Sequence, residues 1–300
     1  MLRSNTAYQL KHADAHSAFK RIALECIWHI QSNQDMVLHD ADIEGVHRLR
    51  VAIRRLRCAF LVFRKVVGKS NSKALMDELT LVSDVLGKAR DLDVFVTQIL
   101  PVVISQFSHH SGMLKLRDKA LLAQAAAYIE VRETLSTKRY HNMLLTLSNW
   151  IESKRWRLNA SGSKTPKVQK IALTNLNKGS KELQLSGNNL ANMQPEARHT
   201  ARIAAKKLRD TAEFFCSLYS TAKSRAYIQN LTQLQDCLGA LNDIAITEKL
   251  LGNIVGIRPS QSQKDALNIF AGWNAFNTLR GNTQLDEIWL KFSAQKPFWH

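Results

Sequence analysis

The feature that most constrains this chain is an internal duplication, in which two consecutive segments recur at a constant spacing of 152 residues. Between His47 and Asp91 this offset gives 14 identities, where chance gives about 3 at ordinary composition. The first pair of segments, starting at His47 and His199, reads HRLRVAIRRLR and HTARIAAKKLR. The second pair, starting at Leu79 and Leu231, reads LTLVSDVLGKARD and LTQLQDCLGALND. A gapless duplication of this kind predicts two halves with the same helical organisation.

Residues 46–67 form a segment without glycine, proline or acidic residues, and they predict an amphipathic helix with Asp42 as its N-cap. Its apolar side carries Leu49, Ile53, Leu56, Phe60 and Phe63. Its opposite side carries His47, Arg50, Arg54 and Arg57. Like charges at this spacing destabilise an isolated helix by a few tenths of a kcal/mol per pair. The cationic side therefore predicts an anionic partner, with an ordinary solvated basic surface as the alternative.

The composition agrees with a folded, basic protein. The chain has 300 residues, 45% of them hydrophobic, which is enough for a substantial core. A net charge of +17 favours an acidic partner such as nucleic acid, polyphosphate or an anionic membrane surface, and charge alone does not choose among them. The four cysteines lack CxxC spacing and are typical of small core residues in a reducing compartment. With neither an apolar leader nor a run of about 18 apolar residues, a cytoplasmic location is expected.

The pattern of apolar residues predicts an all-α fold, since no stretch alternates with period two. We expect helices in the first half to be interrupted by a turn at GKSNS (68–72), at Pro101 and near Ser136, and one in the second half near Gly281. The polar segment LNASGSKTPK, at 158–167, is predicted to be a linker. The simplest architecture is a single domain over 13–297 made of two pseudo-symmetric four-helix bundles, 13–157 and 168–297.

Four of these segments resemble the signature segments of the CHAD family, the conserved histidine α-helical domain. They are HRLRVAIRRLRCAFLVF, LGKARDLDV, RHTARIAAKKLRDTAEFF and LGALNDIAI. The resemblance spans nearly the whole chain, and it implies two four-helix halves around a basic central channel that binds inorganic polyphosphate. Many relatives also carry a CYTH domain marked by ExExK, a motif that is absent here, so a stand-alone CHAD protein is expected.

The resemblance also implies the binding residues. In the first half they are His47, Arg50, Arg54, Arg55, Arg57 and Arg90. In the second half they are His199, Arg202, Lys206, Lys207 and Arg209. The position equivalent to Arg90 is Asn242, so that contact is expected in one half only.

The residue chemistry supports a non-catalytic polyphosphate-binding protein. Polyphosphate has no bases to read, so it needs rows of cationic donors, whereas a specific nucleic-acid binder usually adds aromatic or amide groups. Nonspecific RNA or DNA backbone binding remains the alternative, and polyphosphate-processing hydrolysis is a second one. No cofactor or metal is expected. Association with polyphosphate granules is a further expectation, and membrane insertion is not expected.

Several polar residues have more than one interpretation. His47 and His199 are interpreted as anion donors or as packing groups, because neither has a second ligand at zinc-site spacing. The pairs Asp84 with Asp236 and Asp91 with Asp243 could be acids and bases. The favoured interpretation is that they hold arginines in place or cap helix turns, since no nucleophile motif or phosphate loop accompanies them.

Overall fold

The computed structural model describes residues 10–11, 13–39, 42–153, 166–187, 190 and 193–300, with backbone alone at 69–71. Within these residues the protein is all-α, as predicted, and extended pairing is limited to one isolated bridge between Asp14 and Lys167. The predicted linker falls almost wholly outside the described residues, which resume at Pro166.

The helices follow one another with short connections. In the first half they are α1 (Ala15–His39), α2 (Ile43–Val62), α3 (Arg64–Val67), α4 (Lys69–Val94), the π-helix η1 (Phe95–Ile99), α5 (Leu100–Gln106), α6 (Ser111–Ser136) and α7 (Lys138–Glu152). In the second half they are α9 (Val168–Gly187), α10 (Pro195–Phe215), the 3₁₀-helix η3 (Cys216–Leu218), α11 (Thr221–Val255) and α12 (Gln261–Ser293).

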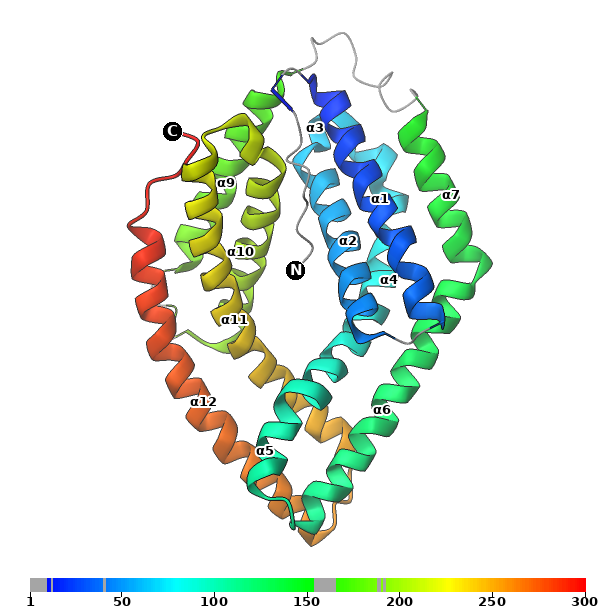
Figure 1. Cartoon of the computed structure of the whole chain (residues 1–300), viewed down its shortest axis with the longest axis vertical. Coiled ribbons are helices and arrows are strands. Elements are labelled where there is room, and N and C mark those ends of the chain that lie inside the picture. The colour runs from blue at the N-terminus through cyan, green and yellow to red at the C-terminus, as the bar shows by residue number, and fades with distance from the viewer. Residues whose placement is uncertain (1–9, 12, 40–41, 154–165, 188–189, 191–192) are drawn as a thin grey trace.

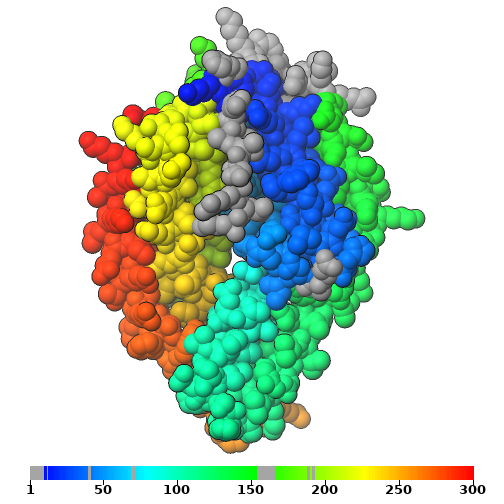
Figure 2. Space-filling view, viewed as in Figure 1, coloured from blue at the N-terminus to red at the C-terminus, as the bar shows by residue number. Residues whose placement is uncertain are grey.

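The two halves lie side by side and meet at one end of the molecule. Figure 1 shows α1, α2, α4 and α7 on one side, and α9, α10 and the first part of α11 on the other. The lower tip is built by α5, α6 and the ends of α11 and α12, and it closes the space between the two sides (Figures 1 and 2). The packing order α1–α2–α4–α6 recurs as α9–α10–α11–α12, as the duplication predicts.

The hydrophobic core joins the halves. One cluster of buried residues draws on both sides of the molecule, and a second fills the tip with side chains from η1, α5, α6, α11 and α12. The predicted apolar side of α2 is buried, from Leu49 to Phe63. Cys26, Cys58 and Cys237 are buried free thiols, as predicted for core residues, whereas the free thiol of Cys216 is only half-buried.

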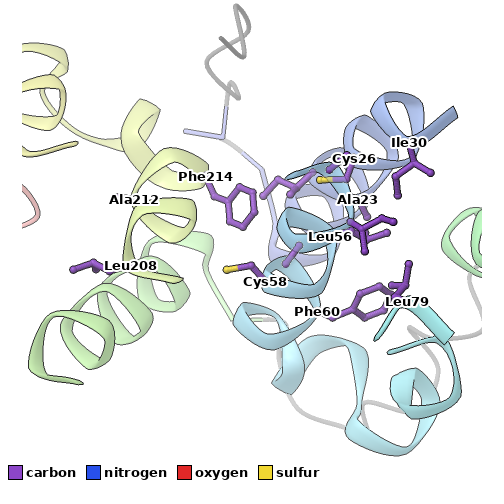
Figure 3. Packing of buried hydrophobic residues seen from close by; sticks show 14 of the residues in the cluster. Ala23, Cys26, Ile30, Leu56, Cys58, Phe60, Leu79, Leu208, Ala212 and Phe214 are labelled. Carbon is purple, nitrogen blue, oxygen red and sulfur yellow. The ribbon is translucent and has the colours of Figure 1, made fainter. Parts of the chain in front are cut away.

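Residues equivalent in the duplication meet one another. The rings of Phe63 and Phe215 lie 5.8 Å apart between centroids, and the two positions are related by the 152-residue offset. Figure 3 shows Cys58 of α2 and Phe214 of α10 pointing into the space between these helices. Contact between equivalent positions is what a two-fold arrangement of the halves produces. The two basic helices therefore run close together at the centre of the molecule.

The predicted helix ends are partly correct. Asp42 is the N-cap of α2 and accepts a 3.0 Å hydrogen bond from the Glu44 amide, as predicted. The basic helix is shorter than predicted, because the backbone leaves helical geometry at Phe63 and again at Gly68. The turn predicted at GKSNS is wrong beyond its first residue. Gly68 alone has a positive φ, of 81°, which a glycine adopts without strain, and α4 begins at the next residue.

Three further interruptions were predicted, with different outcomes. The one near Ser136 is confirmed, since α6 ends at Ser136 and α7 begins at Lys138. The chain is interrupted near Pro101, as predicted, but as a π-helix over Phe95–Ile99, because proline lacks the amide that would continue the α-helical bonding. The break predicted near Gly281 is wrong. Helix α12 continues through this position, and a Cβ there would lie only 2.7 Å from Leu241 Cδ2. A Cβ at this position would force the Leu241 side chain to shift, so glycine lets α11 and α12 pack together without that shift.

Candidate functional site

The site begins where α2 faces α10. Arg54 of α2 forms an ion pair with Asp210 of α10 at 3.4 Å. One turn further along α2, the Cys58 thiol lies 3.9 Å from the Lys207 carbonyl oxygen and 3.8 Å from the Thr211 hydroxyl. Because these contacts hold the two helices close together, the charged side chains that precede them on each helix are brought into one place.

These side chains form a group that we call the central cluster. It comprises Arg50, Arg54, Arg90, Asp91, Arg202, Lys206 and Asp243. Its members come from α2, α4, α10 and α11, the four helices that carry the duplicated segments. Arg50 interacts electrostatically with Asp91 of its own half and with Asp243 of the other, and Arg202 interacts with the same two carboxylates. The duplication thus supplies one shared site rather than two separate ones.

The cations of the central cluster are partly removed from water. Burial, followed by the neighbouring charges of Arg202, Arg54 and Arg50, lowers the pKa of Lys206 to about 7. Burial also lowers the pKa of Arg50 and of Arg202, although an arginine stays charged at neutral pH. Positive charges held at this proximity repel one another, so an added anion would relieve the repulsion.

Three arginines carry buried donors that no group satisfies. Within the described part of the chain, the Nε atoms of Arg50, Arg57 and Arg202 are buried without a hydrogen-bond partner. Buried donors are nearly always paired in folded proteins, and an unpaired one costs about 1–3 kcal/mol. Arg50 and Arg202 are equivalent in the duplication, so the same unsatisfied donor is present in both halves.

Two carboxylates interact electrostatically with Arg50 and Arg202. The pKa of Asp91 is raised by burial, against the opposing effect of Arg50, and the pKa of Asp243 is raised by burial against Arg202. Each carboxylate thus lies by the arginine of its own half, in agreement with the interpretation that these acids hold arginines in place. Asp84 and Asp236, the other predicted pair, are exposed.

The two motif histidines have different environments. Burial, and then the charge of Arg90, lowers the pKa of His47 to about 4, so its ring is neutral at pH 7. Its Nδ1 is buried without a partner in the described chain. His199 is exposed, and its ring Nδ1 is 2.9 Å from Asn242 Oδ1, where the ring donates. Because Asn242 stands at the position equivalent to Arg90, a neutral amide faces one histidine where a cation faces the other.

The remaining predicted residues lie apart from the central cluster. Arg55 forms an ion pair with Glu213 and lies over the Phe214 ring, 5.2 Å from its centroid. Arg209 donates to the same Glu213 from one turn earlier, at 2.9 Å. Lys207 lines a separate pocket. The structure therefore divides these predicted residues among a candidate anion-binding site shared by the two halves, contacts around Glu213 and a separate pocket.

Asp210 and Glu213 are the residues that the sequence analysis missed. They bind Arg54 and Arg55 across the interface between the halves. The duplication contained a signal for them, since the equivalent positions in the first half are Cys58 and Leu61. An acid that appears in only one copy of an otherwise basic motif is a candidate partner for the other copy.

Comparison with known proteins identifies the class of fold and then the family. The structure is similar to the crystal structure of the CHAD domain from the plant Ricinus communis, with a TM-score of 0.81 and 27% identity over 95% of this chain and 94% of that one. It also shares its fold with PptA from Streptomyces chartreusis, at a TM-score of 0.71 and 11% identity, covering 93% of this chain and 100% of that one. The CHAD domain family model matches residues 21–252, and the chain belongs to this family.

A further relative is Rv2226 of Mycobacterium tuberculosis, which is described as an uncharacterized protein. It is 26% identical over 173 residues, which are 56% of this chain and 34% of that protein. The chain thus matches only about a third of this relative's length. Among the helices that the structure describes, none is long and apolar enough to cross a membrane. The described residues also hold no group of three or more His, Cys, Asp or Glu side chains placed to bind a metal ion.

Proposed function

We propose that this protein binds inorganic polyphosphate at the central cluster without hydrolysing it. The observation that carries the proposal is the pair of equivalent arginines, Arg50 and Arg202, whose buried Nε donors lack partners within the described chain. Phosphate oxygens are strong acceptors for arginine, so a bound polyanion would satisfy both donors at once.

The charge of the central cluster favours a polyanion over a single anion. Its cations outnumber its carboxylates, and they come from both halves of the chain. A linear polyanion can contact Arg50 and Arg202 simultaneously, and the second contact is then intramolecular. The family's association with polyphosphate supports the same ligand class. Binding to polyphosphate granules would follow if polyphosphate chains at the granule surface reach the central cluster.

Nonspecific nucleic-acid binding is the competing function. The central cluster consists of arginine, lysine and aspartate, and its cations suit the phosphate groups of a polyanion. A ligand made of phosphate groups alone therefore matches its chemistry. Binding of either polyanion would weaken with salt as counterions are released, so salt dependence alone does not separate them.

A competition experiment tests the proposal. Labelled long-chain polyphosphate is bound to the full chain, and unlabelled RNA is added at matched phosphate concentration. Polyphosphate is expected to remain bound, whereas displacement by RNA at moderate salt would contradict the proposal. Incubation with Mg²⁺ or Mn²⁺ is expected to release no phosphate above buffer. Release that is lost in an Asp91→Asn variant would establish hydrolysis instead.

A matched pair of variants localises the binding. Arg50→Gln combined with Arg202→Gln removes two charge-assisted contacts, each worth about 1.5–3 kcal/mol, so affinity should fall by about a hundredfold or more. The control, Arg225→Gln combined with Arg258→Gln, removes the same charge from exposed positions. Equal losses in both variants would show that net charge, and not the central cluster, binds the polyanion.

A further inference from the structure

A second basic pocket lies outside the central cluster, between the end of α2 with α3 and the helices α9 and α10. It has a volume of about 450 Å³. None of the central-cluster residues lines it. Arg54 of the central cluster lies one helical turn before Cys58, which lines the pocket, so the pocket begins where the cluster ends on α2. The charged side chains of its lining are Arg64, Lys65, Lys170, Lys178, Glu182 and Lys207.

Most of these cations have no acidic neighbour. Lys178 pairs with Glu182 at 3.6 Å, and among the described residues that line the pocket Glu182 is the only acid. Within the described residues, the side-chain cations of Arg64, Lys65 and Lys207 form no ion pair or hydrogen bond. Cationic groups from three helices thus surround one cavity with an excess of positive charge.

The duplication shows how this pocket differs from the equivalent contact between the halves. At the equivalent position in the first half, Arg55 pairs with Glu213 and covers the Phe214 ring. Here the offset replaces Arg55 by Lys207, Glu213 by Leu61 and Phe214 by Val62. All three replacements line the pocket. The acid that would neutralise the cation is missing, and the aromatic ring that would fill the space is replaced by a smaller side chain.

The walls of the pocket are mixed in character. Leu61, Val62 and Ile171 supply apolar surface beside the cations, and Thr174 and Asn175 supply polar groups. A volume of this size lies in the range of small-molecule sites, about 300–1,000 Å³. Cationic and apolar groups that line the same pocket match a ligand that has a phosphate group and an apolar body.

We propose that this pocket binds a small organic phosphate of nucleotide size, independently of polyphosphate binding at the central cluster. The phosphate contacts Lys207 with Arg64 and Lys65, where charge-assisted hydrogen bonds form. The apolar body lies against Leu61 and Val62. Lys207 thus contacts a ligand, whereas the equivalent Arg55 joins the two halves.

The test measures ATP binding by calorimetry on the full chain carrying Arg50→Gln and Arg202→Gln, which weakens any ATP binding at the central cluster. ATP is expected to bind in a one-to-one ratio. Leu61→Glu, which gives Lys207 the acid that Arg55 has, should weaken ATP binding by about tenfold or more. The matched control is Leu122→Glu on α6, which adds the same charge at a position 71% exposed and should change the affinity by less than about twofold.

Two further measurements complete the test. Val62→Phe fills the pocket without changing the charge and is expected to weaken ATP binding as well, provided that helical circular dichroism is retained. Inorganic tripolyphosphate should bind several-fold more weakly than ATP, because it lacks the apolar body. Absence of ATP binding, equal losses in Leu61→Glu and Leu122→Glu, or equal affinity for tripolyphosphate would each overturn the proposal. Failure of polyphosphate binding in the parent chain would leave this result unchanged.

Discussion

Lys206 makes polyphosphate binding depend on pH in a predictable direction. Its pKa in the free protein is about 7, because it is buried and lies near Arg202, Arg54 and Arg50 on α10 and α2, with Asp243 of α11 only partly offsetting them. A bound polyanion favours the charged form and moves this pKa back toward its ordinary value of about 10.4. Binding therefore takes up a proton, and affinity must be highest below the free pKa and fall as the pH rises through it.

The magnitude follows from the two pKa values. With a free pKa of about 7 and a bound pKa near 10, the affinity falls about tenfold between about pH 6 and pH 8. Proton uptake on binding is about 0.5 at pH 7 and about 0.9 at pH 8. Calorimetry in buffers of different ionisation enthalpy measures this uptake directly. Long chains are used because terminal phosphates also titrate near this range, at about pH 6.

Lys206→Arg is the control for this prediction. Arginine keeps the positive charge but does not titrate, so the variant should bind across the same range with a nearly flat pH profile. His47 contributes little above pH 6, since its pKa in the free protein is about 4. If Lys206→Arg retains the tenfold decrease, or if the wild-type affinity rises with pH, then the titration of Lys206 in the central cluster is refuted.

Two pairs of variants test which contacts stabilise the fold. Arg55→Ala breaks a largely buried ion pair but leaves Glu213 paired with Arg209, so the free energy of unfolding should fall by about 1–3 kcal/mol. Lys207→Ala, at the equivalent position, should change the free energy of unfolding by less than about 0.5 kcal/mol. Equal effects in denaturant titrations would show that the two positions do not differ as described. Gly281→Ala should lower stability by about 1 kcal/mol, because its Cβ would overlap the neighbouring helix, and Gly272→Ala, with open space around it, should raise stability by up to about 1 kcal/mol. A stabilising Gly281→Ala would contradict the close packing of α11 and α12.

The sequence predicts the parts of this structure that depend on local pattern. Apolar periodicity predicts the buried side of α2, and the 152-residue offset predicts which helices are equivalent. The position of the α2 N-cap also follows from one residue, Asp42, whose short carboxylate suits the exposed amides of a helix start. Each of these needs only neighbouring residues or a comparison of the chain with itself.

The division of the cationic residues depends on tertiary contacts and could not be predicted in the same way. Arg54 and Arg55 are adjacent, so they point about 100° apart on α2, and only the placement of α10 decides which one meets the central cluster. The depressed pKa of Lys206 likewise depends on tertiary structure, because burial is its largest cause and the charges of Arg54 and Arg50 on α2 add to that of Arg202 on its own helix. The helix break predicted at Gly281 was wrong because a glycine can either interrupt a helix or allow two helices to pack closely. Only the position of the Leu241 side chain shows which of the two applies here.

The contacts between the two halves determine when this protein can fold during its synthesis. The tip cluster needs α5 and α6 together with the last turns of α11, and the central cluster needs α2 together with α10. The central cluster cannot form until α10 and the part of α11 around Asp243 have left the ribosome, and the tip must also wait for the end of α11 and the start of α12. These contacts join residues about 150 positions apart. A nascent or truncated chain that lacks α10 therefore has the cations of α2 alone and no assembled central cluster. Binding at the proposed site would in this sense report that the two halves have folded against each other.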